Sequence, residues 1–282
     1  MSRIPMGSSG GAWVLDPDVA WRTNFVPQGV SADLLATKYG YSRQELDELA
    51  VESQHRAYTA QIKGYFDNSI VPVTDLNGLM ILDKDEYLRP DTTVEDLAEL
   101  QPSFEIQGSQ FGLNGVAMLR YPEVEKIIHV HHPGNSSGIV DGASAVLLGS
   151  KDAGEKSGIK PRAKVSSWAN VGVESSMMLH GPWPATQKAL KNAGMNVSDV
   201  DLCEMNEAFA SPTLHLIRES GLSPDRVNVN GGAIALGHPL GATGSVLIGT
   251  LLDELERRDQ SVGLVTMCMG AGMGIATIIE RL

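Results

Sequence analysis

The chain has 282 residues, enough for one large domain or two ordinary ones. Hydrophobic residues make up 42% and charged residues 20%, and the 30 glycines follow no three-residue period; this composition excludes a disordered or a collagen-like chain. The net charge of −12, from 22 Lys and Arg against 34 Asp and Glu, disfavours nucleic acid and anionic lipid as partners.

The sequence predicts a protein of the cytoplasm. No stretch approaches the roughly 18 continuous apolar residues that a membrane span requires, and no apolar signal segment follows Met1. Only two cysteines occur, Cys203 and Cys268. Without a secretory signal we expect both to be reduced thiols, and their separation matches no metal-site spacing.

Residues 1–136 carry helices and short strands without a repeated strand-helix unit. A helix is predicted over 31–39, with Ser31 as its N-cap. A longer helix follows Ser42, and Glu45 three residues later completes a capping-box pattern. Further along, the patterns predict strands at 70–73 and 80–82, a capped helix from residue 91, and irregular structure over 102–133.

From residue 137 the pattern changes to alternating strands and helices, which predicts an α/β fold with helices packed on a sheet. After an apolar stretch at 143–148, strands are predicted at 163–169, 200–205, 227–229, 262–267 and 275–279. Helices are predicted at 185–192, 207–219 and 241–258. A short Gly-rich turn joins the final two strands, so we expect them to be antiparallel. The predicted domains are therefore 1–136 and 137–282.

Three side chains stand in settings suited to chemistry. Asn206, His238 and Cys268 each follow a predicted strand, and open α/β sheets place ligands at such strand ends. His238 can exchange protons near neutral pH, but a surface or helix-capping histidine fits the pattern too. Cys268 precedes amides that can stabilise a thiolate, yet a buried thiol is the alternative. Asn206 can serve an oxyanion or cap the next helix.

These segments together resemble the C-terminal motifs of thiolases, the acetyl-CoA acetyltransferase family. The chain carries NEAFA from 206, GGAIALGHPLGATG from 231, Cys-x-Gly from 268 and IIERL at its end, in the family's order. The resemblance continues upstream through GNSSGIVDGASAVLL at 134–148 and GPWPATQKALKNAG at 181–194, and covers nearly the whole chain. It implies a thiolase-like α/β half preceded by a loop domain.

The resemblance implies acyl transfer between carbon and the sulfur of coenzyme A (CoA): thiolytic cleavage of a 3-oxoacyl-CoA, or the reverse condensation. His238 matches the activating histidine, Cys268 the acid/base cysteine, and Asn206 the asparagine of an oxyanion hole. Gly270 matches the glycine of a second oxyanion hole. Ser137 and Met178 match positions that line the CoA pocket. CoA and acyl-CoA would be substrates, no cofactor would be permanently bound, and a full-length homodimer or homotetramer in fatty-acid degradation is implied.

The family's nucleophilic cysteine lies in an N-terminal half that this sequence appears to lack, by roughly 110 to 120 residues. Cys203 lies within a predicted strand, so we interpret it as a core residue. We therefore predict that the chain alone is inactive in thiolysis and that its uncovered inner face causes association. A fragment, a misplaced start and a natural truncation all remain open.

Three alternatives are weighed against this hypothesis. A non-catalytic CoA-binding or interaction protein derived from a thiolase would keep the same motifs. A dinucleotide-binding fold is disfavoured, because the glycines at 231–244 do not form GxGxxG after a first strand. His129, His131 and His132 hint at a metal site, but the sequence places no carboxylate or cysteine in a fitting pattern nearby, so no metal is predicted.

Overall fold

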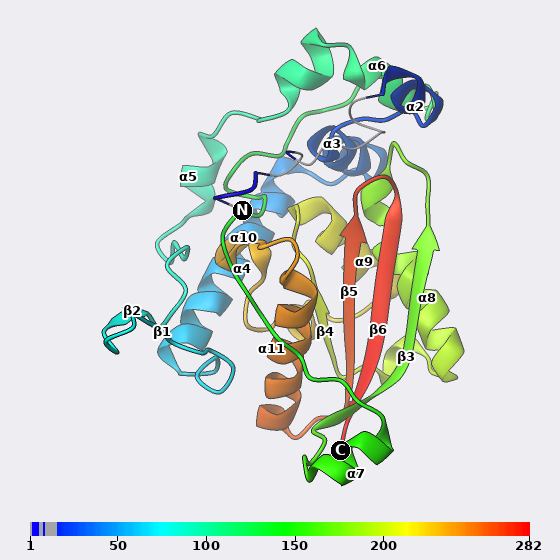
Figure 1. Ribbon diagram of the computed structural model, residues 1–282. Coiled ribbons are helices and arrows are strands. Elements are labelled where there is room, and N and C mark those ends of the chain that lie inside the picture. Colours follow the sequence, from blue (N-terminus) through cyan, green and yellow to red (C-terminus); the bar gives the residue numbers. More distant parts are fainter. Residues whose placement is uncertain (1, 6–7, 9–15) are drawn as a thin grey trace.

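The computed structural model describes residues 2–5, 8 and 16–282, and its first part consists of helices, loops and one small two-stranded sheet (Figure 1). Helices α3 and α4 are its longest elements and pack beside the C-terminal sheet domain. The elements are α2 (Pro17–Arg22), α3 (Gln28–Tyr39), α4 (Arg43–Ile62), β1 (Val73–Thr74), β2 (Met80–Leu82), α5 (Val94–Ala98), a π-helical turn (Ile106–Gln110) and α6 (Leu113–Met118).

Helix α4 begins as the sequence predicts. The Ser42 side chain accepts a hydrogen bond from the Glu45 amide, and the Glu45 carboxylate accepts one from the Ser42 amide, so the capping box is confirmed. The prediction for α3 is wrong at its start, because the helix begins at Gln28 after Pro27. Ser31 lies inside α3 and is fully buried, so tertiary packing extends the helix by one turn beyond its local signal.

The second part is an α/β domain built around a four-stranded sheet. Its elements are α7 (Lys151–Ser157), β3 (Ala163–Gly172), α8 (Pro182–Ala193), β4 (Leu202–Met205), α9 (Ala210–Ser220), α10 (Ala233–Leu236), α11 (Thr243–Arg258), β5 (Val262–Met269) and β6 (Met273–Arg281). Three 3-10 turns complete it, at Met178–His180, Val197–Asp199 and Pro224–Arg226.

The sheet has the order β3-β6-β5-β4. Strands β5 and β6 form the predicted antiparallel hairpin, whereas β4 and β5 run parallel. The mixed α/β class is therefore confirmed. The strand expected at 227–229 is wrong, because Val227 makes only an isolated bridge to Cys203 at the edge of the sheet.

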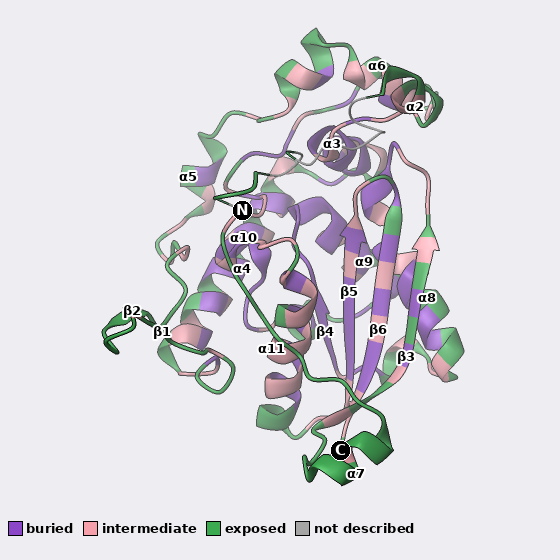
Figure 2. Ribbon diagram, viewed as in Figure 1, coloured by how far each residue is buried: buried purple, intermediate pink, exposed green. Residues whose placement is uncertain are grey.

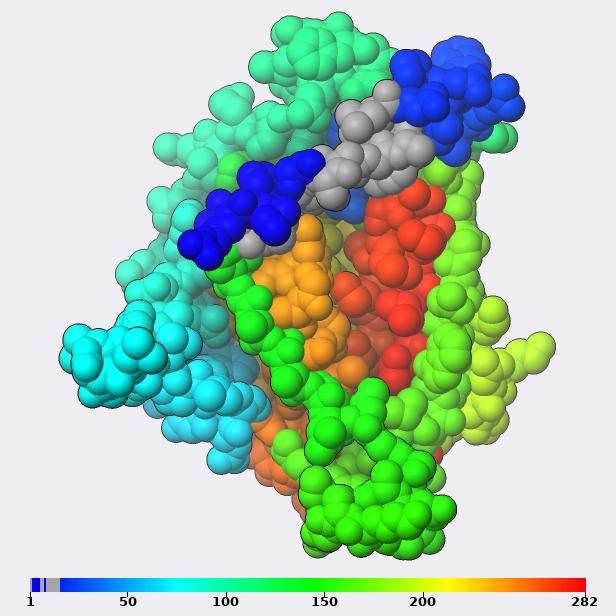
Figure 3. Space-filling model, in the orientation of Figure 1, coloured from blue at the N-terminus to red at the C-terminus, as the bar shows by residue number. Residues whose placement is uncertain are grey.

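Helices cover the two faces of the sheet differently (Figures 1 and 2). Helix α8 packs on β3 and β6 over one apolar core, while α11 packs on β4 and β5 over another. Beyond α11 the second face is open at the edge strand, where the Trp168 side chain is 62% exposed. The apolar stretch at 143–148 joins no strand, and Leu147 is 80% exposed. Figure 3 shows this segment passing over the front of the molecule.

Among the described residues, no helix is long and apolar enough to cross a membrane.

Candidate functional site

Asn206 lies directly after β4, where the parallel neighbour β5 holds its backbone. The Asn206 amide donates a hydrogen bond to the Thr266 carbonyl at 3.1 Å, and the residue is fully buried. Helix α9 starts only at Ala210, with Phe209 at the N-cap position. The expectation of a helix from residue 207 with Asn206 as its cap is therefore wrong, and the Asn206 side chain is left to interact elsewhere.

His238 is held in place by the backbone of the loop before α11. Its amide donates to the Gly138 carbonyl at 2.8 Å, which ties it to the segment from Gly134 onward. Gly237 has φ of +86°, and a Cβ there would lie 2.5 Å from the Val140 side chain. Only glycine can adopt this φ and also avoid the clash with Val140, so the turn requires glycine at position 237.

The His238 imidazole contacts two side chains. Its Nδ1 lies 2.6 Å from the Thr243 hydroxyl, and its Nε2 lies 3.3 Å from the Asn206 side-chain nitrogen. An amide nitrogen can only donate, so Nε2 accepts and Nδ1 carries the proton. Burial lowers the pKa of His238, which keeps the ring neutral with its lone pair on Nε2. The alternative of a surface or capping histidine is wrong, because the ring is half-buried and α11 is capped at Ala242.

A cavity of about 330 Å³ lies between the segment from Val140 to Ser144 and the turn from Pro239 to Ala242, which directly follows His238 in the chain. One carbonyl of that turn, from Ala242, accepts a hydrogen bond from the Ser144 hydroxyl at 2.7 Å.

Cys268 lies within β5, one residue before the strand ends, so it stands at the strand end that the sequence predicts. It is 6% exposed and belongs to a core cluster that also contains Met178 and Phe209. Burial raises the pKa of the Cys268 thiol to about 12, so the sulfur is protonated at neutral pH. The structure thus brings Cys268 and Met178 into one cluster, next to the segment that follows Asn206.

Two further predicted site residues lie near these groups in the chain fold. The Ser137 amide donates to the Ala208 carbonyl at 3.0 Å, two residues after Asn206. Gly270 opens the turn between β5 and β6, where Ala271 and Gly272 both have positive φ. A Cβ on Gly272 would lie 2.5 Å from the Val173 carbonyl oxygen, so the turn packs tightly on the segment after β3.

Cys203 is a core residue, as predicted. It is 1% exposed and packs in the cluster under α8, and burial raises the pKa of its thiol above the ordinary range. Its position in β4 removes it from the candidate site.

The three histidines before Gly134 pair with carboxylates. His129 and His131 contact the two oxygens of Asp33 at 2.6 and 2.7 Å, and His132 contacts Asp47 at 2.8 Å. The expectation that no carboxylate lies near them is wrong, because α3 and α4 supply both from about 90 residues away in sequence. Within the described part of the chain, no group of three or more His, Cys, Asp or Glu can hold a metal ion.

Sequence reasoning missed two groups that support the site. Thr243, the first residue of α11, holds the His238 ring; its place five residues after the histidine is the only sequence signal. The buried Glu207 carboxylate accepts hydrogen bonds from Ser53 of α4, from Asn228 and from the Ile234 amide. This network joins the helical part of the chain to the loop that carries His238.

Comparison with known sequences identifies two domains of one family. The family model described as the thiolase C-terminal domain matches residues 159–281, and the thiolase N-terminal domain matches residues 3–112. The chain is 46% identical to the 3-ketoacyl-CoA thiolase of Serratia proteamaculans and 42% identical to an acetyl-CoA acetyltransferase of Paracoccus denitrificans. It spans 62% and 60% of those proteins, and the matches cover 90% of this chain.

Solved structures of acetyl-CoA acetyltransferases and 3-ketoacyl-CoA thiolases also match the chain. The Bacillus anthracis acetyl-CoA acetyltransferase matches with a TM-score of 0.79 at 34% identity, over 94% of this chain and 64% of that one. Human mitochondrial 3-ketoacyl-CoA thiolase, solved in complex with CoA, matches with a TM-score of 0.80 at 37% identity, over 94% and 62%.

These matches correct one expectation in part. Residues 3–112 match the N-terminal domain, so the chain does not lack that domain altogether. It still spans only about three fifths of the length of the curated relatives it matches.

Proposed function

Because the chain belongs to the thiolase family, we propose that its site is an acyltransferase site for acyl-CoA, cleaving 3-oxoacyl-CoA with CoA or catalysing the reverse condensation. The observation that carries the proposal is the neutral His238 imidazole with Asn206 on Nε2 and Thr243 on Nδ1. Cys268, in the adjoining cluster, supplies a protonated thiol.

In the cleavage direction, the thiolate of a nucleophilic cysteine attacks the 3-oxo carbon, and the bond between C2 and C3 breaks. The electron pair stays on C2 as an acetyl-CoA enolate, which takes its proton from the Cys268 thiol. The raised pKa of Cys268 suits this donor role. The Cys268 thiolate then takes the proton of the CoA thiol, and the CoA sulfur attacks the acyl group on the nucleophilic cysteine, whose sulfur leaves as acyl-CoA forms. The Asn206 side chain and the Gly270 amide are the groups that we assign to the two oxyanions, and His238 takes the proton of the attacking thiol.

The nucleophile is not among the residues of this chain. Its two cysteines are Cys203, in the core of the sheet, and Cys268, which the proposal uses as acid and base. We therefore propose that the 282-residue chain by itself does not perform thiolysis. The same fact favours a second candidate, a CoA-binding protein without catalysis, because the groups around His238 can orient a thioester without a nucleophile.

The finer assignments rest on the relatives. The names of several relatives as 3-ketoacyl-CoA thiolases support a role in fatty-acid degradation. Reduced, buried cysteines support a cytoplasmic location. Ser137 and Met178, which lie beside the NEAFA segment and Cys268, are the residues that we assign to the CoA pocket. A homodimer or homotetramer is part of the same proposal.

Deuterium exchange into the methyl group of acetyl-CoA separates the two candidates, because it needs the minor thiolate form of Cys268 as the base but no nucleophile, so the exchange should be faster at higher pH. The chain is incubated with acetyl-CoA in heavy water and the thioester is analysed by mass spectrometry. We expect exchange that Cys268→Ala abolishes and that the matched control Cys203→Ala retains. Binding of CoA without exchange supports the non-catalytic candidate. Failure to bind CoA contradicts both, and breakdown of acetoacetyl-CoA by the chain alone contradicts the proposed inactivity.

A further inference from the structure

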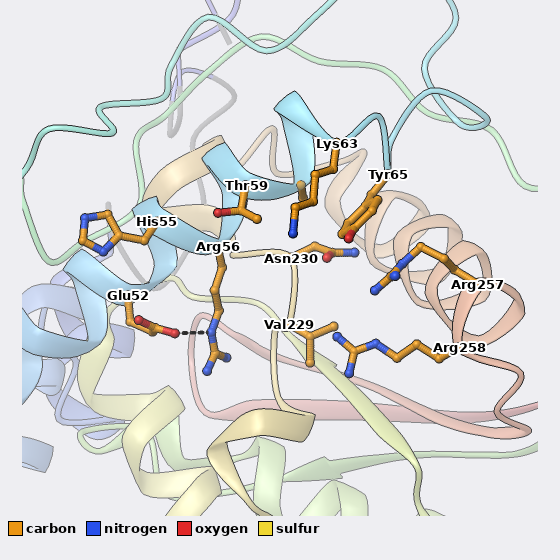
Figure 4. Close-up of a pocket in the computed structure, with 11 residues that line it drawn as sticks. Glu52, His55, Arg56, Thr59, Lys63, Tyr65, Val229, Asn230, Arg257 and Arg258 are labelled. Carbon is orange, nitrogen blue, oxygen red and sulfur yellow. Dashed lines mark hydrogen bonds and ion pairs between the residues drawn. The ribbon is translucent and has the colours of Figure 1, made fainter.

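A second cavity lies far from His238, between the C-terminal halves of α4 and α11 (Figure 4). It has a volume of about 280 Å³, and the segment Val229–Asn230 forms its floor. We call it the α4–α11 pocket and define it by Arg56, Thr59, Lys63, Asn230, Arg257 and Arg258. The catalytic proposal uses none of these residues.

Four cations converge on this pocket in a chain whose net charge is −12. Three carboxylates pair with them: Glu52 and Asp225 with Arg56, at 2.6 and 3.7 Å, and Glu254 with both Arg257 and Arg258. Four cations against three carboxylates leave an excess of one positive charge. A local excess of this kind attracts anions even when the protein as a whole repels them.

The guanidinium groups of Arg257 and Arg258 are held in place by the buried Glu254 carboxylate. Glu254 is 1% exposed and accepts hydrogen bonds from Arg257 and Arg258, and Asn230 donates to the same carboxylate at 3.0 Å. The Arg257 guanidinium also lies 3.9 Å from the centre of the Tyr65 ring. Both arginines use only part of their N–H groups in these contacts, so donors remain for a ligand.

Lys63, directly after the end of α4, is the fourth cation of the pocket. Within the described residues its ammonium makes no ion pair or hydrogen bond, and it lies over the Tyr65 ring at 6.0 Å. Figure 4 shows Lys63 and Thr59 on α4 facing the arginines of α11 across the cavity. A ligand between them would be contacted from both helices.

We propose that the α4–α11 pocket binds a phosphoryl anion. A phosphate monoester carries a charge of about −1.5 to −2 at neutral pH, so the local excess of positive charge attracts it. Its oxygens fit the planar donors of arginine, and the lysine adds a point charge. The volume lies just below the range of about 300–1,000 Å³ for drug-sized ligands, so the group bound is small: inorganic phosphate, diphosphate or the phosphorylated end of a nucleotide.

This site is distinct from the one around His238. His238 contacts Thr243, the first residue of α11, whereas Arg257 and Arg258 are its last two. A helix of 16 residues is about 24 Å long. The pocket also joins the two parts of the chain, because α4 belongs to residues 1–136 and α11 to residues 137–282. Occupancy should therefore stabilise the contact between them.

Isothermal titration calorimetry with inorganic phosphate and with diphosphate tests the proposal. We expect saturable binding to the chain that weakens at least tenfold in Lys63→Gln and in Arg258→Gln. Lys63→Gln is the safer variant for folding, because it removes only the distant contact with the Tyr65 ring, whereas Arg258→Gln removes a partner of buried Glu254. Lys191→Gln is the matched control: it removes the same charge from the exposed side of α8 and should leave binding unchanged.

Two further ligands show which kind of anion the pocket recognises. Adenosine 3′,5′-bisphosphate that binds tighter than phosphate, with the same loss in Lys63→Gln, identifies a nucleotide as the source of the phosphoryl group; weaker binding identifies the free anion. Citrate tests whether the pocket recognises charge alone. The proposal is overturned if no ligand saturates the chain, if citrate binds as tightly as diphosphate, or if Lys191→Gln weakens binding as much as Lys63→Gln.

Discussion

The side-chain nitrogen of Asn206 lies 3.3 Å from Nε2 of His238, although 32 residues separate the two in sequence. On the other side of the ring, Thr243 lies 2.6 Å from Nδ1. The pair of contacts selects the tautomer with the proton on Nδ1 and the lone pair on Nε2, and burial lowers the pKa of the ring and favours its neutral form. This arrangement is the part of the site that can be tested without substrate.

Thr243→Val should lower both the pKa of His238 and the stability of the chain. The hydroxyl accepts the Nδ1 proton more strongly from the charged ring, so its loss disfavours protonation further. We expect His238 to titrate below its ordinary value of about 6.5 in the unmodified chain and lower still in the variant. The loss of one hydrogen bond should cost about 0.5–1.5 kcal/mol. NMR titration and urea unfolding measure the two effects. Thr250→Val, on the same helix, is the control; an equal effect there contradicts the assignment.

Asp33→Asn should destabilise the chain by about 2–4 kcal/mol at neutral pH. Burial raises the pKa of Asp33, but hydrogen bonds from His129 and His131 lower it by more, and the net pKa is below the ordinary value. The contribution to stability is therefore present above the unfolded pKa of about 3.9 and is lost as the pH falls through the lower folded pKa. Unfolding free energies measured from pH 7 down to pH 3 check this. The exposed Asp83→Asn should change little.

Glu204→Gln should stabilise the chain at high pH, whereas Asp33→Asn should destabilise it. Burial raises the pKa of Glu204 well above its ordinary value, and the nearby Glu207 and Glu254 raise it further. The folded chain holds a proton that the unfolded chain releases, so stability is highest below the unfolded pKa of about 4.3 and falls as the pH rises. The amide removes this loss, and we expect a gain of about 1–4 kcal/mol at pH 8 that disappears near pH 4. A loss of stability at pH 8 would show that Glu204 is charged and paired.

Both cysteines should resist alkylation in the folded chain. Burial raises the pKa of Cys268 to about 12 and raises that of Cys203 further, so neither is a thiolate at neutral pH. Iodoacetamide followed by mass spectrometry should find both unmodified in buffer and both modified in urea. Rapid labelling of Cys268 alone in buffer would mean that the β5–β6 turn opens and exposes the thiol.

The open edge of the sheet should cause association. Trp168 and Val165 on β3 are 62% and 48% exposed, and Leu147 and Leu148 on the neighbouring extended segment are 80% and 71% exposed. Exposed apolar side chains on an edge strand favour contact between copies. Sedimentation velocity should show concentration-dependent association that Trp168→Lys reduces. Trp21→Lys, at an equally exposed tryptophan on α2, is the control. A monomer at all concentrations contradicts the prediction.

Local signals predicted the elements that depend on neighbours in the chain. The capping box of Ser42 and Glu45 lies within four residues and starts α4 as expected. The hairpin of β5 and β6 needs only two apolar runs and a glycine-rich turn between them. Where tertiary packing competes, local signals failed: α3 starts before Ser31, and α9 starts three residues later than its pattern indicated.

The sequence by itself determined the family and the identity of Asn206, His238 and Cys268 as candidates, because its long motifs have a fixed order. It did not determine which side chains contact one another. Only the tertiary structure brought Asp33 to His129 and His131 across nearly 100 residues, set Thr243 against His238, and gathered Lys63 with Arg257 and Arg258. These contacts depend on how α3, α4 and α11 pack on one another and on the sheet, and that packing is decided by burial over the whole chain rather than by any short segment of it.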